Sequence, residues 1–399
     1  MKIAIYKILL IVIIVFCLVV IIVIAGKPQA GDKEVIQEPF IPEAESEIQS
    51  DWPMFRGGQQ LLGRAPGTLP DSLKFAWKFK TDDQIKSSPV IYNNTVFVGS
   101  SDSNIYAIDL EKGHKIWTYQ TEGEIESTPC VVEDSIYIGS SDDFLYALDA
   151  KSGSFKWKYE TGGQILGAAN WVYSPDGKRV WILVGSYDNK LHCVDSQSGQ
   201  TVWTYETDNY INGSPAVDRQ MTVFGGCDAK IHVLSLTDGS LIKEIEAGSY
   251  IAASAAFVDE QVYVGNYDNE FIKADINTGQ ILWKYVGDNS PFFSSPAIGH
   301  NVVIVGGRDN RLHCVNRDNG KIIWTFQTLG EVDSSPVICG DKVVVGSEDG
   351  RLYMARLSDG KQVWSYEIGQ PVTSSPAVAN RMVVVGSDDG YVYAFRAEQ

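Results

Sequence analysis

Short runs of alternating hydrophobic and polar residues cover most of the chain after residue 70. The first four of these runs are SSPVIY, TVFVGS, NIYAID and HKIWTYQT. Turn-forming residues separate the runs, as at Asn93-Asn94 and at Glu111-Lys112-Gly113. Alternation with period two indicates β-strands, and the turn residues indicate hairpins between them. The sequence therefore predicts a group of four short antiparallel strands.

This group recurs at intervals of about 40 residues along the chain. Three markers reveal the repeat independently: a Trp in the fourth run, a Ser/Thr-Pro step in the first run, and a Gly that ends the second run. The fourth-run positions are Trp77, Trp117, Trp157, Trp203, Lys243, Trp283, Trp324 and Trp364. Each marker position occurs eight times, with Ala replacing the Pro twice. Four antiparallel strands repeated at this period predict an all-β, eight-bladed β-propeller.

The two ends of the repeat region complement each other. The last unit begins at Ser374 and ends at Gln399 with only three runs, whereas LKFAWKFKT from Leu73 matches a fourth run. We therefore expect the N-terminal strand to complete the last blade, which leaves no open edge between the first and last blades. Unit three is six residues longer than its neighbours because it contains SPDGKR at residues 174–179. That insertion predicts a longer surface hairpin.

The turn between the third and fourth runs has a recurring motif, seen in YAIDLEKGHKIW, YALDAKSGSFKW and HCVDSQSGQTVW. Its Gly is present in all seven units that contain the turn, whereas its Asp is replaced by Ser235, Asn316 and Arg356. A catalytic set spread around a ring would not tolerate such replacements. We therefore predict a structural motif in which the Asp and Gly form the turn and the seven Trp residues dock one blade on the next.

These motifs resemble the AxDxxxGxxxW repeat of the PQQ-type (quinoprotein-like) β-propeller family, in its BamB-like branch. The lead-in DWPMFRG at residues 51–57 resembles the same family, so the resemblance covers residues 51–399. For a cofactor-free member, it implies protein partners in the cell envelope. For a quinoprotein dehydrogenase, it implies a disulfide between adjacent Cys residues, an acidic base and Ca²⁺ ligands around the quinone. The fold alone does not choose between these functions.

The six Cys residues include no adjacent pair and no spacing that fits zinc. The near-constant repeat length also leaves little material for a lid over a substrate. We therefore expect a non-catalytic envelope scaffold that binds protein partners and uses no cofactor or metal. The alternatives are a small PQQ- and Ca²⁺-dependent alcohol or sugar dehydrogenase, and an extracellular sensor or glycan-binding module.

Charge and the N-terminal segment bear on location. Residues 51–399 hold 29 basic and 44 acidic residues, a formal net charge of −15, which excludes nucleic acid as a partner. Residues 8–25 carry no charge and would span ~27 Å as a helix, close to the ~30 Å hydrocarbon core of a bilayer. We expect residues 1–26 to be a signal anchor or signal peptide and residues 27–50 a disordered acidic linker. Because Lys2 and Lys7 precede the apolar run, the propeller is predicted on the extracytoplasmic (periplasmic or extracellular) side of the membrane.

The loops that lead into the first strands differ most between the units. In a propeller these loops lie close to the axis, on the same face as the hairpins between second and third strands. Exposed aromatic side chains beside carboxylates suit a binding surface. The candidate partner-binding residues are Gln84, Glu124, Tyr210, Tyr250, Phe292, Phe293, Glu331 and Asp333.

Two other recurring positions have structural interpretations. An Asp recurs in all eight hairpins between second and third runs, and we predict that it forms turns and not a metal ring. His192, His232 and His313 share one strand position, where other units have Tyr106 or Tyr146, and we predict that they pack between sheets. No catalytic residue is expected.

Overall fold

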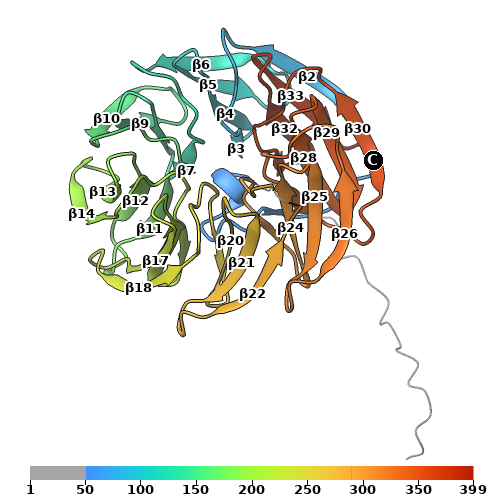
Figure 1. The fold of residues 1–399 in the computed structure, drawn as a ribbon. Helices are drawn as coiled ribbons and strands as arrows, with labels where there is room; N and C mark the ends of the chain where they lie inside the picture. Colours follow the sequence, from blue (N-terminus) through green and yellow to red (C-terminus); the bar gives the residue numbers. More distant parts are fainter. Residues whose placement is uncertain (1–50, 289, 399) are drawn as a thin grey trace, which may run out of the picture. The chain divides into compact units, whose positions relative to one another are not determined.

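The computed structural model describes residues 51–288 and 290–398. Within these ranges, eight blades of four antiparallel strands each surround a central axis as a propeller, and one of the eight sheets gains a short fifth strand (Figure 1). The predicted all-β, eight-bladed fold is therefore confirmed. The helical content of these ranges is one 3₁₀ turn, η1 (Phe55–Gly57), and none of their helices is long and apolar enough to cross a membrane. The predicted signal or anchor (1–26) and linker (27–50) lie outside the described residues.

In each of the first seven blades, the four strands follow in sequence from the axis outward. Blade 1 contains β3 (Val90–Tyr92), β4 (Thr95–Gly99), β5 (Asn104–Asp109) and β6 (Lys115–Gln120), and blade 2 contains β7 (Cys130–Val132), β8 (Ser135–Gly139), β9 (Phe144–Asp149) and β10 (Phe155–Glu160). Blade 3 contains β11 (Asn170–Tyr173), β12 (Val180–Gly185), β13 (Lys190–Asp195) and β14 (Thr201–Glu206), and blade 4 contains β15 (Ala216–Asp218), β16 (Met221–Gly225), β17 (Lys230–Ser235) and β18 (Leu241–Glu246). Blade 5 contains β19 (Ala256–Val258), β20 (Gln261–Gly265), β21 (Glu270–Asp275) and β22 (Ile281–Val286), and blade 6 contains β23 (Ala297–Ile298), β24 (Val302–Gly307), β25 (Arg311–Asn316) and β26 (Ile322–Gln327). Blade 7 contains β27 (Val337–Cys339), β28 (Lys342–Ser347), β29 (Arg351–Arg356) and β30 (Gln362–Glu367).

Blade 8 is completed by the N-terminal strand, as the sequence predicts. Its own strands are β31 (Ala377–Ala379), β32 (Met382–Gly386) and β33 (Tyr391–Arg396), and β2 (Lys74–Lys80) pairs antiparallel with β33. A further short strand, β1 (Arg64–Ala65), pairs parallel with β27 in blade 7. The ring is thus closed by hydrogen bonds between the two ends of the described chain (Figure 1).

The recurring Trp and Gly meet at the junctions between blades. Trp117 lies against Gly153 of the next blade, and a Cβ at that glycine would come within 2.6 Å of the indole. The Trp117 indole N–H also donates to the Ala150 carbonyl at 3.1 Å. Contacts of both kinds join Trp77, Trp157, Trp203, Trp283 and Trp324 to the blade that follows each. Trp364 instead packs against Phe395, with ring centroids 5.3 Å apart.

The Ser/Thr-Pro marker forms a ring of hydrogen bonds near the axis. The backbone N–H of Ser335 donates to the Ser375 hydroxyl at 3.0 Å, and that of Ser375 donates to the Ser88 hydroxyl at 2.9 Å. Seven of the eight blade pairs in the described chain are joined in this way. The exception is the pair of blades 2 and 3, where Ala168 has no hydroxyl to accept the bond. The hydroxyl of this marker therefore accepts a hydrogen bond from a buried backbone N–H of the preceding blade, which explains why Ser or Thr recurs there.

The segment before the repeats crosses the axis at one face of the ring. We call residues 51–65 the lead-in segment, and the face where they lie the lead-in face. Their backbone is hydrogen-bonded to the ends of six first strands, through Ile91, Val131, Val217, Phe257, Ile298 and Ile338. Arg56 in this segment is buried and donates to the carbonyls of Pro296, Ser335 and Pro336. Burial lowers the pKa of Arg56 to about 9.

Candidate functional site

The opposite face, where the first strands begin, holds the variable loops, and we call it the first-strand face. In every blade, a backbone hydrogen bond ties the first-strand loop to the hairpin between the second and third strands. In blade 5, for example, the Tyr267 N–H donates to the Tyr250 carbonyl at 3.0 Å. Loops and hairpins thus form one continuous rim. In each blade, the loop residue that accepts this bond lies beside the hairpin residue that comes directly before the recurring Asp.

Aromatic side chains line the rim in blades 3 to 6. We call Tyr187, Tyr210, Tyr250, Tyr267 and Phe293 the aromatic arc. Tyr187 and Tyr210 are stacked, with centroids 4.9 Å apart and an interplanar angle of 5°. Tyr267 lies 6.2 Å from Tyr250 and 4.6 Å from Phe293, measured between ring centroids. Tyr210, Tyr250 and Tyr267 remain 48%, 54% and 45% exposed, so their ring surface is available to a partner.

Arg308 joins the aromatic arc to a group of carboxylates. Its guanidinium carbon lies 3.8 Å from the Phe293 ring centroid, in a cation–π contact. Its Nη2 lies 2.6 Å from Asp333 and its Nε lies 3.2 Å from Glu331. Burial opposes the charge on Arg308, but the bond to Asp333 and the nearby carboxylates outweigh it and raise the pKa of Arg308 above its ordinary value.

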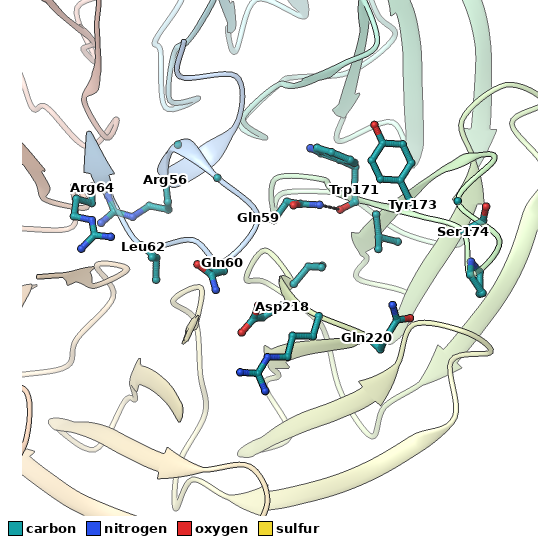
Figure 2. A pocket seen from close by; sticks show the side chains of 17 residues that line it. Arg56, Gln59, Gln60, Leu62, Arg64, Trp171, Tyr173, Ser174, Asp218 and Gln220 are labelled. Atoms are coloured by element: carbon teal, nitrogen blue, oxygen red, sulfur yellow. Dashed lines mark hydrogen bonds between the residues drawn. The ribbon is translucent and has the colours of Figure 1, made fainter. Parts of the chain in front are cut away.

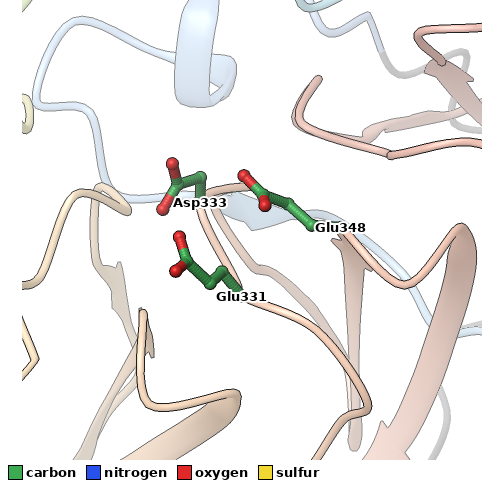
Figure 3. Close-up of side chains that lie close together, drawn as sticks. All are labelled: Glu331, Asp333 and Glu348. Atoms are coloured by element: carbon green, nitrogen blue, oxygen red, sulfur yellow. The ribbon is translucent and has the colours of Figure 1, made fainter.

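Three carboxylates gather on blade 7, and we call Glu331, Asp333 and Glu348 the acidic triad (Figure 3). One oxygen from each lies within 4.8 Å of the others. Burial, together with the charges of Asp333 and Glu331, raises the pKa of Glu348 above its ordinary value. Arg308 bonds two members of the triad, so its guanidinium offsets part of their negative charge.

Charged and polar residues continue the rim through blades 8, 1 and 2. Lys86 and Glu126 form an ion pair at 2.7 Å, and burial raises the pKa of Asp388. Gln84 and Glu124 are exposed beside them. The first-strand face therefore has an aromatic half and an ionic half, which meet at Arg308.

Seven of the eight predicted partner-binding residues lie on this rim, but Phe292 does not present its side chain there. Phe292 is 1% exposed and packs against Gly265 of the preceding blade. The other blades have Ile or Val at this buried position, each packed on the Gly that ends a second strand. The prediction of Phe292 as an exposed binding residue is therefore wrong, because Phe292 is the inward member of the Phe292-Phe293 pair.

The sequence-based prediction missed the hairpin residues that complete the rim. The residues before the recurring hairpin Asp are Ser101, Ser141, Tyr187, Cys227, Tyr267, Arg308, Glu348 and Asp388. This position varies between the eight units, although the Asp that follows it is the same in all of them. That contrast could have indicated that the position belongs to a binding surface.

In seven of the eight blades, the recurring Asp carboxylate bonds to a Tyr or His side chain of the third strand, whereas the Asp268 carboxylate in blade 5 forms no hydrogen bond among the described residues. The Asn104 N–H donates to Asp102 at 2.9 Å, which closes the turn, and the Tyr106 hydroxyl donates to the same carboxylate at 2.7 Å. In blades 3, 4 and 6 a buried His replaces the Tyr, as where His192 Nε2 lies 3.1 Å from Asp188. These His residues pack at the junction between sheets, each beside a Tyr of the preceding blade.

The described residues do not fit the quinone centre that the family resemblance implies. The five described Cys residues are free and far apart in sequence, so no disulfide of neighbours can form. Two of the three carboxylates of the acidic triad, Glu331 and Asp333, are paired with Arg308, so a cation at the triad would compete with this guanidinium.

Comparisons with solved structures identify the same fold. A computationally designed protein, Ika8, superimposes with a TM-score of 0.72 at 18% identity, covering 82% of this chain and 100% of its own. BamB from Moraxella catarrhalis gives 0.67 at 20% identity, with the same coverages. Quinohemoprotein alcohol dehydrogenase from Comamonas testosteroni gives 0.73 at 15% identity, covering 87% of this chain and 80% of its own. At these identities the likeness concerns the fold alone.

A search of curated protein sequences finds no significant match. The family model described as "Outer membrane protein assembly factor BamB" matches residues 71–178, 174–285 and 308–399, which together exceed half of the chain. These matched segments cover most of the repeat units whose motifs first indicated the PQQ-type propeller. The chain therefore belongs to the PQQ-type β-propeller family described as outer membrane protein assembly factor BamB.

Proposed function

We propose that this protein is a non-catalytic scaffold of the cell envelope that binds a protein partner on its first-strand face. The observation that carries the proposal is the continuous rim in which the aromatic arc meets Arg308 and the acidic triad. Tyr and Arg dominate the energetics of protein interfaces because they combine large contact areas with hydrogen bonding. The family's description as an assembly factor of the outer membrane supports the same class of function.

The proposed location follows from the apolar N-terminal run and the family. We propose that residues 1–26 hold the protein at a membrane, with the propeller on the extracytoplasmic side. Protease added to intact cells with a permeabilised outer layer should digest the propeller, while a cytoplasmic marker stays intact. Protection of the propeller under these conditions would contradict the proposal.

Site-specific photo-crosslinking tests the proposed partner surface. A crosslinking amino acid at Tyr250, on the aromatic arc, should give a defined adduct with one envelope protein in living cells. The matched control is Phe155, which is similarly exposed at 51% but lies on the outer strand β10. Adducts from Phe155 with none from Tyr250 would place the partner elsewhere.

We also propose that the protein is not an enzyme of the quinoprotein class. The free, separated Cys residues and the pairing of Glu331 and Asp333 with Arg308 support this proposal. The full-length protein should not oxidise alcohols or sugars when it is supplied with PQQ, Ca²⁺ and a dye acceptor. Sustained turnover above the protein-free rate would overturn the scaffold proposal in favour of a dehydrogenase.

A further inference from the structure

The longest departure from the repeat lies beside a cavity on the lead-in face. The six inserted residues, 174–179, form the hairpin between β11 and β12 in blade 3, and no other unit gains more than one residue. A cavity of about 660 Å³ lies between this hairpin, the first strands of blades 3 and 4, and the lead-in segment (Figure 2). The inserted residues Ser174, Pro175 and Gly177 line it. Chain length is thus added at the place where the surface is hollowed.

One wall of the cavity is aromatic. Trp171 and Tyr173 project from β11, with ring centroids 5.3 Å apart and planes at 89° (Figure 2). Tyr173 is 52% exposed, so its ring is accessible to a ligand. Its ring offers an apolar surface on which the C–H face of a pyranose ring can stack, while the sugar hydroxyls remain free to bond elsewhere.

Three polar side chains without internal partners line part of the remaining surface. Gln60 comes from the lead-in segment, and Asp218 and Gln220 come from the end of β15 and its turn (Figure 2). Among the described residues, none of these three side chains is hydrogen-bonded to another part of the protein, whereas Gln59 beside them donates to the Trp171 carbonyl at 2.7 Å. Two amides and one carboxylate provide both donors and acceptors, the combination that sugar hydroxyls require.

The backbone of this wall is already satisfied, which disfavours an extended peptide as the ligand. The Trp171 N–H donates to the Asn170 side chain at 2.7 Å, and the Val217 N–H donates to the Gln59 carbonyl at 2.8 Å. A peptide that binds as an added strand needs free backbone groups along an edge. The Asn170 side chain and the lead-in segment occupy these groups on β11 and β15, so recognition in the cavity depends on side chains.

We propose that this cavity binds a short oligosaccharide, with one pyranose ring stacked on Tyr173, Trp171 standing at right angles beside it, and the sugar hydroxyls bonded to Gln60, Asp218 and Gln220. The site lies on the face opposite the aromatic arc, so it is independent of the protein-binding proposal. A scaffold with both sites could hold a protein partner while it contacts a glycan.

The test is a glycan array probed with the full-length protein in a detergent without a sugar headgroup. Each hit is then titrated by calorimetry. Tyr173→Ala and Gln220→Ala should each weaken binding at least tenfold, about 1.4 kcal/mol. Tyr173→Phe should retain affinity because the ring is kept, and Tyr210→Ala, which removes a similarly exposed Tyr from the first-strand face, should also retain it.

Three results would overturn the proposal. The first is no binding to any arrayed glycan at millimolar concentrations. The second is binding that Tyr173→Ala leaves unchanged while the variant stays folded. The third is selective binding of proline-rich peptides, lost in Tyr173→Ala, which would assign the cavity to a peptide ligand.

Discussion

At the residue scale, Tyr residues at equivalent strand positions differ in whether their hydroxyl bonds across the blade junction. The Tyr159 hydroxyl lies 3.0 Å from His192 Nδ1 in the next blade, and His192 Nε2 contacts Asp188. Tyr119 occupies the equivalent strand position one blade earlier, but its hydroxyl has no hydrogen-bond partner among the described residues. The repeat thus supplies its own matched controls.

Removing the Tyr159 hydroxyl should destabilise the propeller. Tyr159→Phe removes the bonds of this hydroxyl to His192 and to Thr201, and the loss of each such bond costs about 1 kcal/mol in the free energy of unfolding. Tyr119→Phe, the control, should leave the melting temperature unchanged. Equal effects in the two variants, measured by thermal melting at pH 7, would show that the junction bond contributes nothing.

Asp188 should confer a pH-dependent stability. Burial opposes its charge, but the bond to His192 and the charge of His192 outweigh burial and lower the pKa of Asp188 to about 2. A carboxyl whose pKa falls on folding stabilises the native state above its ordinary pKa, and this stability is lost as the pH falls towards the native value. Asp188→Asn should therefore lower the melting temperature at pH 7 and have progressively less effect between pH 4 and pH 2.

The control for this titration is Asp268→Asn in blade 5. Asp268 is the equivalent hairpin residue, but it is exposed, and its carboxylate forms no hydrogen bond among the described residues. Its variant should melt like the unmodified protein at every pH. If Asp188→Asn lowered the melting temperature by the same amount at every pH, the assigned role of the Asp188 carboxylate would be wrong.

At the element scale, the recurring turn glycines serve the junctions between blades. Gly153 has φ of +70° and lies under Trp117, whereas Gly177 in the inserted hairpin has φ of +69° and an open surrounding. Gly177→Ala should cost about 1 kcal/mol for its backbone conformation alone. Gly153→Ala should cost a further ~1–3 kcal/mol, since its Cβ would overlap the indole. If chemical denaturation showed equal losses of stability for Gly153→Ala and Gly177→Ala, the packing of Trp117 on Gly153 would not contribute to stability.

Lys243 is the one fourth-strand position among these junctions without a Trp. Its Nζ donates to the Asn277 carbonyl at 2.5 Å, and its side chain lies over Gly279, so Lys partly imitates the indole. Lys243→Trp should raise the melting temperature by about 2 °C because it buries more apolar surface at the junction. A clear fall in the melting temperature would show that this junction cannot accept the ring.

At the scale of the whole molecule, the repeat explains why the fold could be predicted and the site only in part. The strands, the eight blades and the closure by residues 74–80 all follow from period and pattern. The crossing of the axis by the lead-in segment could not be predicted, because a different residue of this segment contacts each of six blades and no repeat in the sequence marks these contacts. Phe292 was misplaced because the extra residue in unit six obscured which Phe matches the buried Ile of other units. Arg308 and Tyr267 were missed because they join the site only when hairpins and loops meet in space.

The central claim is that the first-strand face holds the protein partner. Its most direct test is the affinity of the full-length protein for the partner identified by crosslinking, measured for the double variant Tyr250→Ser/Tyr267→Ser. Loss of these two exposed rings should weaken binding at least tenfold without lowering the melting temperature. The control double variant Ile116→Ser/Phe155→Ser removes similarly exposed side chains from outer strands and should bind normally. Full affinity in the first double variant, or a loss confined to the second, would contradict the account.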